Sequence, residues 1–259
     1  MDLGLNGQLV LITGGSKGLG LACARLFLAE GARVAITSRS QANLDKATAE
    51  LGAGVLAIAA DMTDPQATAE MVRRVEAEMG PIDVLVTSAG AARRTPPDDL
   101  TPEIWRAGLN AKFFSYVNVL DPVVKLMAAR GRGVIVNIIG SGGKVPTPTH
   151  LAGGAANAAL MLVTAGLSTT YAGRGVRVVG INPGLTHTSR VGEGLVAESK
   201  VQGVPPDEAL RRIESRIPAG RLGEPEEIAN MAVFLASPRA SYTHGAIVTM
   251  DGAAGAMVV

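Results

Sequence analysis

The sequence predicts an α/β protein built on a single doubly wound, parallel sheet. Short β-rich apolar runs alternate with longer helical stretches along the 259 residues, and this alternation indicates repeated βαβ units. Two of the runs, VLVTSA and VIVNII, are continuously apolar, as strands buried on both faces are. Because 47% of the residues are hydrophobic, the chain can cover such a sheet on both sides within one domain.

Seven strands and six long helices are expected. The strands are Gln8–Thr13, Arg33–Ser38, Val55–Ala60, Ile82–Thr87, Gly133–Ile139, Val176–Ile181 and Ala246–Met250. The helices are 18–30, 41–51, 65–79, 103–129, 151–172 and 225–236. Ligands of doubly wound sheets bind beyond the carboxyl ends of the strands, so we expect the functional residues directly after each strand.

One segment, 186–221, departs from this alternation. Its roughly 35 residues separate the sixth strand from the last long helix and are long for a connection. The sequence PPDEALRRIESRI within it places Leu210, Ile213 and Ile217 on one helical face. A long insertion at the ligand end of a sheet is typical of a lid or substrate-specificity segment. The alternative is a surface helix pair that contributes only to packing.

Composition narrows the functional class. With 24 basic and 23 acidic residues the formal net charge is +1, so we expect no nucleic-acid partner. The N-terminus lacks the positive region of a signal peptide, and we expect no apolar run of the ~18 residues that a membrane span requires. The single cysteine, Cys23, excludes an intramolecular disulfide and fits a reducing, cytoplasmic compartment. It and three scattered histidines provide no metal-ligand spacing, so no metal is expected.

A glycine-rich loop, residues 13–20 (TGGSKGLG), follows the first strand and opens the first helix. Glycines allow the backbone to approach a ligand closely, and a helix N-terminus binds anions through its free amides. A glycine-rich sequence by itself is weak evidence for a phosphate site. Between a strand and a helix, as here, it is strong evidence and predicts a pyrophosphate site.

The loop resembles the T-G-x-x-x-G-x-G motif of the short-chain dehydrogenase/reductase superfamily, and four later segments agree with that family in order and spacing. Asp61 follows the third strand, like the family's adenine contact, and Ser-Ala-Gly at 88–90 follows the fourth, like its Asn-Ala-Gly. Asn-Pro-Gly at 182–184, with Thr188, resembles the segment that holds the nicotinamide carboxamide. The sequence RLGEPEEIA at 221–229, followed by FLAS and DG, resembles the family's C-terminal signature.

The resemblance covers essentially the whole chain. It implies a Rossmann-type fold, a nicotinamide cofactor, and a homotetramer or homodimer built through the helices at 103–129 and 151–172, whose small-residue faces (Gly153 and Gly154 among them) would permit close approach. The residues that it places at the cofactor are Gly14, Ser16, Lys17, Gly18, Leu19, Gly20, Ser38, Arg39, Asp61, Met62, Ser88, Ala89, Gly90, Asn110, Pro183, Gly184, Thr186 and Thr188.

The end of the second strand predicts NADP(H) rather than NAD(H). An acid at this point binds the ribose hydroxyls of NAD, and an arginine accommodates the 2′-phosphate of NADP. Here no acid occurs between Glu30 and Asp45, and Arg39 stands 19 residues after Gly20. A guanidinium suits bidentate phosphate recognition, and Lys17 adds positive charge to the loop. The alternative is that Arg39 is a solvated charge at the strand end.

The catalytic block departs from the family. A family member reduces a carbonyl with a tyrosine as proton donor, a lysine four residues later and a preceding serine. These positions hold Gly153, Asn157 and Gly140, while the fourth catalytic position, Asn110, is intact. Glycine has no side chain and asparagine supplies no ammonium. None of the three tyrosines is placed as a substitute: Tyr116, Tyr171 and Tyr242.

Other polar groups stand near the vacated positions. His150 precedes Gly153 by three residues, so in a helix both would share one face, and an imidazolium could replace tyrosine and lysine together. Ser141 adjoins the vacated serine position and could donate a hydrogen bond, and Lys144 could bind an anionic substrate. The alternative for each is an ordinary loop residue. The same holds for residues that could make the pocket cationic or supply another acid: Arg93, Arg94, His187 and Arg190.

These observations favour an NADP(H)-dependent oxidoreductase acting on a small, possibly anionic, carbonyl or alcohol substrate through an atypical site of His150, Ser141 and Asn110. A cofactor-binding protein without hydride transfer and a non-redox enzyme on the same fold are the alternatives.

Overall fold

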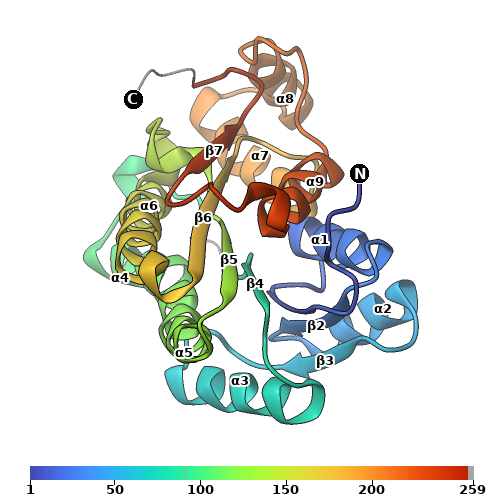
Figure 1. The fold of residues 1–259 in the computed structure, drawn as a ribbon. Coiled ribbons are helices and arrows are strands. Elements are labelled where there is room, and N and C mark those ends of the chain that lie inside the picture. Colours follow the sequence, from blue (N-terminus) through green and yellow to red (C-terminus); the bar gives the residue numbers. More distant parts are fainter. Residues whose placement is uncertain (91, 256–259) are drawn as a thin grey trace.

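The computed structural model describes residues 1–90 and 92–255, with the side chains of Arg190 and Glu193 left out. It forms the expected doubly wound sheet, in which seven strands pair in parallel in the order β3-β2-β1-β4-β5-β6-β7 (Figure 1). The strands are β1 Leu9–Thr13, β2 Arg33–Ser38, β3 Leu56–Ala59, β4 Val84–Thr87, β5 Gly133–Ile138, β6 Val176–Pro183 and β7 Ile247–Met250. The chain crosses over between β3 and β4, so the carboxyl ends of β1 and β4 meet at the switch point where such folds bind ligands.

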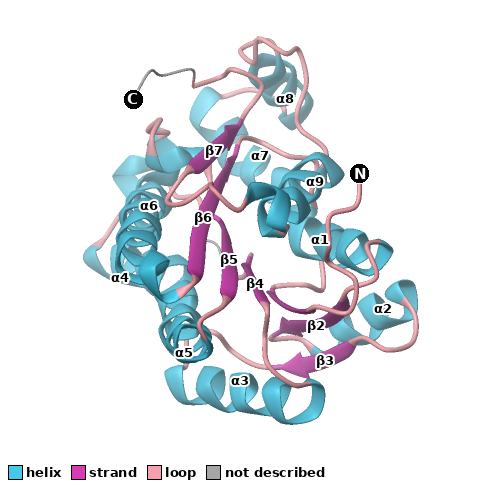
Figure 2. Ribbon diagram, viewed as in Figure 1, coloured by secondary structure: helices cyan, strands magenta, loops and turns pink. Residues whose placement is uncertain are grey.

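Helices cover both faces of the sheet (Figure 2). The helices are α1 Gly18–Ala29, α2 Gln41–Leu51, α3 Pro65–Met79, α4 Pro102–Leu109, α5 Ser115–Arg130, α6 Leu151–Tyr171, α7 Ser189–Gln202, α8 Pro206–Glu214 and α9 Pro225–Ala236. A π-helix spans Asn110–Phe114, and single 3₁₀ turns lie at Pro97–Asp99, Ser141–Gly143, Pro148–His150, Ala172–Arg174 and Pro238–Ala240. Helices α1, α2 and α9 pack on one face, and α3, α5 and α6 pack on the other.

Alternate strand residues build two cores, because successive side chains of a strand point to opposite faces. On β1, Val10 and Ile12 belong to the core under α1 and α9, whereas Leu9 and Leu11 belong to the core under α3 and α5. Cys23 lies in the first core, where burial raises the pKa of its thiol to about 12, so it remains a neutral thiol at ordinary pH.

The expected elements are present, with small changes at their ends. The expected helix 103–129 is interrupted by the π-helix Asn110–Phe114, so it runs as α4 and α5. Within 186–221 the chain forms two helices, α7 and α8, and α8 ends at Glu214, so Ile217 lies beyond the helical face that was expected to include it. Pro206 opens α8, since proline is favoured at the first position of a helix.

The expectation that no stretch could span a membrane needs correction. By length and composition the helical stretch Pro148–Arg174 is long and apolar enough to cross a membrane. In the fold, however, its central helix α6 packs on the sheet, where Asn137 of β5 donates a hydrogen bond of 2.9 Å to the buried hydroxyl of Thr164. A core helix passes the same test of composition, so the stretch carries no argument for a membrane.

Candidate active site

The glycine-rich loop leaves a helix N-terminus open for an anion. Lys17 is the N-cap of α1, its side chain makes no capping hydrogen bond, and the first turn carries no acid. The first amides of a helix have no intrahelical partner and carry the positive end of the dipole. The end of α1 is therefore uncompensated by the described residues around it, as a pyrophosphate site requires.

Close packing explains the loop's glycines. Gly14 has φ +70°, and a Cβ on it would lie 2.9 Å from the backbone of Ala89. A Cβ on Gly20 would lie 2.8 Å from the carbonyl carbon of Gly14 and closer still to its oxygen. A Cβ on Gly18 would lie 3.3 Å from Thr188, so the loop faces the segment after β6. The expected phosphate and nicotinamide segments thus meet across one gap.

Positive charge stands at the ends of the first two strands. Thr13 and Thr37 pair at the ends of β1 and β2, so the following residues share one edge of the sheet. Lys17 and Arg39 are both exposed there, and neither side chain has a hydrogen-bond or ion-pair partner within the described part of the chain. Ser38, half-buried between them, accepts a bond from the backbone of Ser40. This arrangement fits a 2′-phosphate.

The adenine end of the expected cofactor site is also assembled. Asp61 is exposed, and one carboxylate oxygen accepts hydrogen bonds of 2.9 Å from the amide and the hydroxyl of Thr63. Met62 is buried, and its carbonyl accepts a bond from Asn118. The amides of Ser88 and Ala89 donate to Thr13. These bonds fix the ends of β3 and β4 beside the glycine-rich loop.

The segment after β6 is held by backbone contacts. Gly184 stands so close to Asp251 that a Cβ on it would lie 2.8 Å away. Thr186 is buried, donates to the carbonyl of Gly184 and forms a β-bridge to Gly223. These contacts fix the backbone after β6, with Thr188 opposite Gly18, and the contact of Pro183 and Gly184 with a nicotinamide stays a prediction.

His150 fills the space that the missing tyrosine leaves. A Cβ on Gly153 would lie 2.5 Å from Nε2 and 2.7 Å from Nδ1 of His150, with Cε1 closer still. A Cβ on Gly142 would lie 3.0 Å from the other side of the same ring. The imidazole is thus seated between two glycine backbones; it could not lie there if residue 153 had a side chain, and a side chain at residue 142 would force it to shift slightly.

The route by which His150 reaches this place differs from the expected one. His150 does not lie in a helix with Gly153; it ends the 3₁₀ turn Pro148–His150 and is the N-cap of α6, with φ −127° and ψ 27°. Its ring folds back over the first turn of α6 instead. The two residues still meet, as the spacing predicted.

Asn157 extends toward the vacated serine position. Its Nδ2 would lie 2.9 Å from a Cβ on Gly140, and the residue is only 4% exposed. Its Oδ1 is buried and has no hydrogen-bond partner among the described residues. A buried amide oxygen without a donor is costly, so this atom fits a ligand that brings a donor, such as a ribose hydroxyl. Ser141 is half-buried in the adjoining 3₁₀ turn.

Asn110 is exposed where α4 meets the π-helix. π-Helical turns interrupt α-helices mostly at functional sites. The turn brings Ala111 against the loop after β4, since a Cβ on Gly90 would overlap the carbonyl of Ala111. This contact places the π-helix that begins at Asn110 beside the loop after β4.

A lysine–tyrosine pair that sequence reasoning missed lies behind the site. Lys112 Nζ donates to Tyr116 Oη at 2.7 Å and to the carbonyl of Ile138 at 3.3 Å, and Tyr116 Oη also bonds that carbonyl. Both side chains are buried, Tyr116 fully. They fix the end of β5 two residues before Gly140. The i, i+4 spacing of lysine and tyrosine within an apolar sequence, NAKFFSYV, was the available signal.

The remaining polar candidates are either half-buried or exposed. Lys144 is half-buried near the 3₁₀ turn, and Arg94 is half-buried against Thr149. Arg93 is exposed, and His187 turns outward, with Nε2 3.9 Å from Glu224. The side chain of Arg190 lies outside the described ones. Over 1–90 and 92–255, no three acidic, histidine or cysteine side chains are grouped to hold a metal ion.

Comparison with known proteins agrees with this geometry. Residues 14–254 match the family model described as enoyl-(acyl carrier protein) reductase. Galactitol 2-dehydrogenase of Cereibacter sphaeroides is 37% identical over 251 residues, which cover 96% of this chain and 95% of that protein. Gluconate 5-dehydrogenase of Gluconobacter oxydans is 34% identical over 255 residues, 96% and 94% of the two chains. The chain belongs to the short-chain dehydrogenase/reductase superfamily.

Solved structures of this superfamily share the whole fold. A variant of actinorhodin polyketide ketoreductase, determined with NADPH, has a TM-score of 0.93 at 28% identity and covers 97% of this chain and 98% of its own. L-Sorbose reductase of Gluconobacter frateurii, determined with NADPH and L-sorbose, has a TM-score of 0.89 at 31% identity, with the same coverage. The Rossmann-type fold is confirmed, and these neighbours support the expected NADP(H).

Proposed function

We propose that this short-chain dehydrogenase/reductase is an NADP(H)-dependent oxidoreductase that acts on a small carbonyl or alcohol substrate with His150 as its proton donor. The single observation that carries the proposal is the seat of the imidazole against Gly153, in the space that a side chain at that position would occupy. Its setting supports the proposal: the anion-binding start of α1 and the unpartnered Arg39 are both present.

In this proposal, separate residues bind the cofactor and protonate the substrate. When bound, the nicotinamide supplies or accepts a hydride. The amides at the start of α1 hold the pyrophosphate, and Arg39 with Lys17 binds the 2′-phosphate. His150 holds a proton on a ring nitrogen and gives it to the oxygen of the substrate, which imidazole can do near neutral pH. The hydroxyl of Ser141 donates a hydrogen bond to the same oxygen.

Asn157 takes over part of the work of the absent lysine and serine. Its amide nitrogen is a donor at the place of a serine side chain, and its orphaned Oδ1 accepts from a ribose hydroxyl of the cofactor. It is neutral, so it cannot lower the pKa of a phenol as an ammonium does.

A second function is favoured by the same residues. Gly140, Gly153 and Asn157 remove the phenol, the hydroxyl and the ammonium together, which fits a cofactor-binding protein without hydride transfer, or a non-redox enzyme. In that function His150 serves only to fill the space above Gly153.

The test is His150→Ala in the NADPH-bound protein, after a screen of ketones that finds a substrate. We expect kcat to fall at least ~10²-fold, the usual worth of general acid catalysis, with NADPH affinity unchanged. His244→Ala is the matched control, because His244 is exposed and precedes β7 at the opposite end of the sheet.

Two outcomes would reject this role. An unchanged kcat in His150→Ala would assign the proton to another group. NADPH binding without turnover of any ketone in the screen would favour the cofactor-binding protein over the oxidoreductase.

The assembly we propose is a homo-oligomer, dimer or tetramer, in the cytoplasm, formed through α5 and α6. Of the small residues expected on the face of α6, Gly153 and Gly154 turn inward toward His150 and Gly142, whereas Ala155 and Ala158 are exposed as expected. The exposed stripe of α6 includes Ala155, Ala158 and Leu162, the last 76% exposed. Light scattering of the wild type and of Leu162→Glu would test this, with a shift toward monomer expected for the variant.

A further inference from the structure

Arg94 is a partly desolvated cation beside the proposed active site. It stands four residues after Gly90, in the segment that connects β4 to α4, and is half-buried. Its Nη1 donates to Thr149 Oγ1 at 3.2 Å, and no other hydrogen bond of its five donors is made to a described residue. A guanidinium that leaves water normally finds an anion or several acceptors.

The acid nearest to Arg94 approaches it indirectly. Thr149 Oγ1 donates to Glu198 Oε2 at 3.4 Å, and Glu198 Oε1 accepts from Gln202 Nε2 at 2.9 Å. Burial lowers the pKa of Arg94, and the charge of Glu198 acts in the opposite direction. Glu198 thus compensates part of the charge without forming an ion pair.

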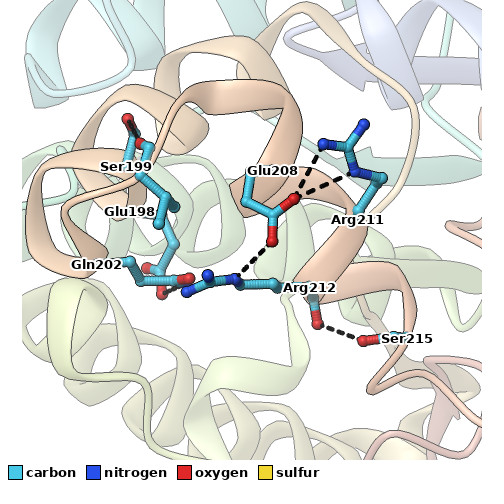
Figure 3. A network of polar contacts seen from close by, with 8 residues as sticks. Glu198, Ser199, Gln202, Glu208, Arg211, Arg212 and Ser215 are labelled. Carbon is cyan, nitrogen blue, oxygen red and sulfur yellow. Dashed lines mark hydrogen bonds and ion pairs between the residues drawn. The ribbon is translucent and has the colours of Figure 1, made fainter.

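The helix that carries Glu198 lies directly on Arg94. A Cβ on Gly194 of α7 would lie 3.0 Å from Arg94 Nε and 3.1 Å from Cδ, so the guanidinium would have to shift if this residue had a side chain. Helix α7 packs against its neighbour α8, within which Glu208 accepts hydrogen bonds from both Arg211 and Arg212 (Figure 3). Arg94 is therefore covered by a helix, α7, rather than by a free loop.

A cavity of about 480 Å³ opens on the other side of Arg94. Its charged lining is Arg93, Arg94 and Asp99, and its apolar wall comes from α4 and the π-helix, Ile104 to Ala111. Asp99 has its own cation, because Lys200 of α7 lies 3.5 Å from it. Two guanidiniums thus line the cavity against one carboxylate that is already paired, which favours an anion inside it.

The cavity lies near the turn that carries the proposed proton donor, although His150 is not one of its lining residues. Thr149, which binds Arg94, precedes His150 in the same 3₁₀ turn. The floor of the cavity at Gly108 touches the first turn of α6, since a Cβ on it would lie 2.8 Å from Ala152. A small molecule bound to Arg94 in the cavity would therefore lie near the first turn of α6.

We infer that Arg94 determines specificity by binding the carboxylate of a small oxo acid or hydroxy acid, an inference that rests on the proposed function for the oxidoreduction of that substrate. The planar guanidinium binds a carboxylate through two parallel hydrogen bonds. In this arrangement the segment 186–221 acts as a specificity segment, because its α7 closes over the anion.

The test measures binding to the protein–NADP⁺ complex, in which no carbonyl can be reduced. The probes are short oxo acids (acetoacetate, 4-oxopentanoate) and their methyl esters, titrated by calorimetry or ligand-observed NMR. We expect each acid to bind at least ~10-fold more tightly than its ester, as a charged hydrogen bond provides, and Arg94→Gln to remove the difference. Arg106→Gln is the control, since Arg106 is exposed on α4 and pairs with Glu103.

Glu198→Gln separates anion binding from a structural latch. If Arg94 binds substrate, removing the competing charge should tighten acid binding, whereas a latch would be weakened and acid binding would fall. Equal affinity for acids and esters, or weaker acid binding in a folded Glu198→Gln protein, would overturn the inference. Acid-selective binding without turnover of any substrate would support the role of Arg94 and contradict only the proposed hydride transfer. Turnover of neutral ketones without a preference for acids would support hydride transfer and contradict the role of Arg94.

Discussion

The half of the sheet around β1, α1 and β2, where the nucleotide is expected, keeps the sequence motif of the family. The half around β5 and α6, where catalysis is expected, does not. In β1, α1 and β2 the glycine-rich loop keeps its motif, and its glycines are required by backbone contacts such as that of Gly20 with Gly14. In β5 and α6 the strand and the helix are present, while the three positions that the resemblance assigns to serine, tyrosine and lysine hold Gly140, Gly153 and Asn157. The difference teaches that cofactor binding here depends on backbone geometry, which tolerates little, whereas chemistry depends on a few side chains that can be exchanged without loss of fold.

The residues at the changed positions are closely packed by their neighbours. The space above Gly153 is filled by His150, and the space beside Gly140 is approached by Asn157. A site that had merely decayed would leave cavities, each of which costs stability. The following predictions test whether the two halves differ in this way.

The largest effect is expected in the nucleotide half, for Gly20→Ala. The added carbon meets backbone atoms of Gly14 at 2.8 Å or less, and backbone cannot turn aside as a side chain can. We expect the free energy of unfolding to fall by about 3 kcal/mol, the upper part of the range for overpacking, and NADPH affinity to fall at least ~100-fold, about 2.7 kcal/mol. Chemical denaturation and calorimetry measure these. Normal NADPH affinity would show that the loop is less constrained than the contacts indicate.

The next effect belongs to the catalytic half, for Gly153→Ala. The added carbon meets the ring of His150, which is a side chain and can move. We therefore expect a folded protein with normal NADPH affinity, in which kcat falls at least ~10²-fold because the proton donor is displaced. Steady-state kinetics with any substrate of the wild type would measure this. Wild-type kcat in this variant would contradict the role of the imidazole.

A smaller effect tests the cofactor preference. We expect wild-type protein to bind NADP(H) at least ~10-fold more tightly than NAD(H), about 1.4 kcal/mol, because Arg39 stands unpaired and exposed after β2. Arg39→Ala should abolish this difference and leave NAD(H) affinity as it is. Calorimetric titration of both cofactors measures it, and a preference that survives the substitution would assign the 2′-phosphate to other residues.

The smallest effect has the opposite sign. A Cβ on Gly166 of α6 would meet no atom within 4 Å, so Gly166→Ala should raise the free energy of unfolding by up to about 1 kcal/mol through helix propensity alone. It should change neither kcat nor NADPH affinity. The same substitution at Gly20, Gly153 and Gly166 thus separates a backbone clash, a side-chain clash and open space.

The sequence by itself determined the sheet, its order of elements, the glycine loop and the absence of the phenol and the ammonium. These features are local: periodicity, turn residues and short motifs each constrain a few consecutive residues, so they can be read along the chain. Tertiary structure alone decided that the imidazole of His150 folds back over Gly153 from a 3₁₀ turn. It also decided that Lys112 and Tyr116 bond the end of β5, and that Arg94 binds Thr149 while it packs against α7. Most of these contacts join residues far apart in sequence, and they depend on how helices pack on the sheet. That packing follows from side-chain shape across the whole core, which no short stretch of sequence contains.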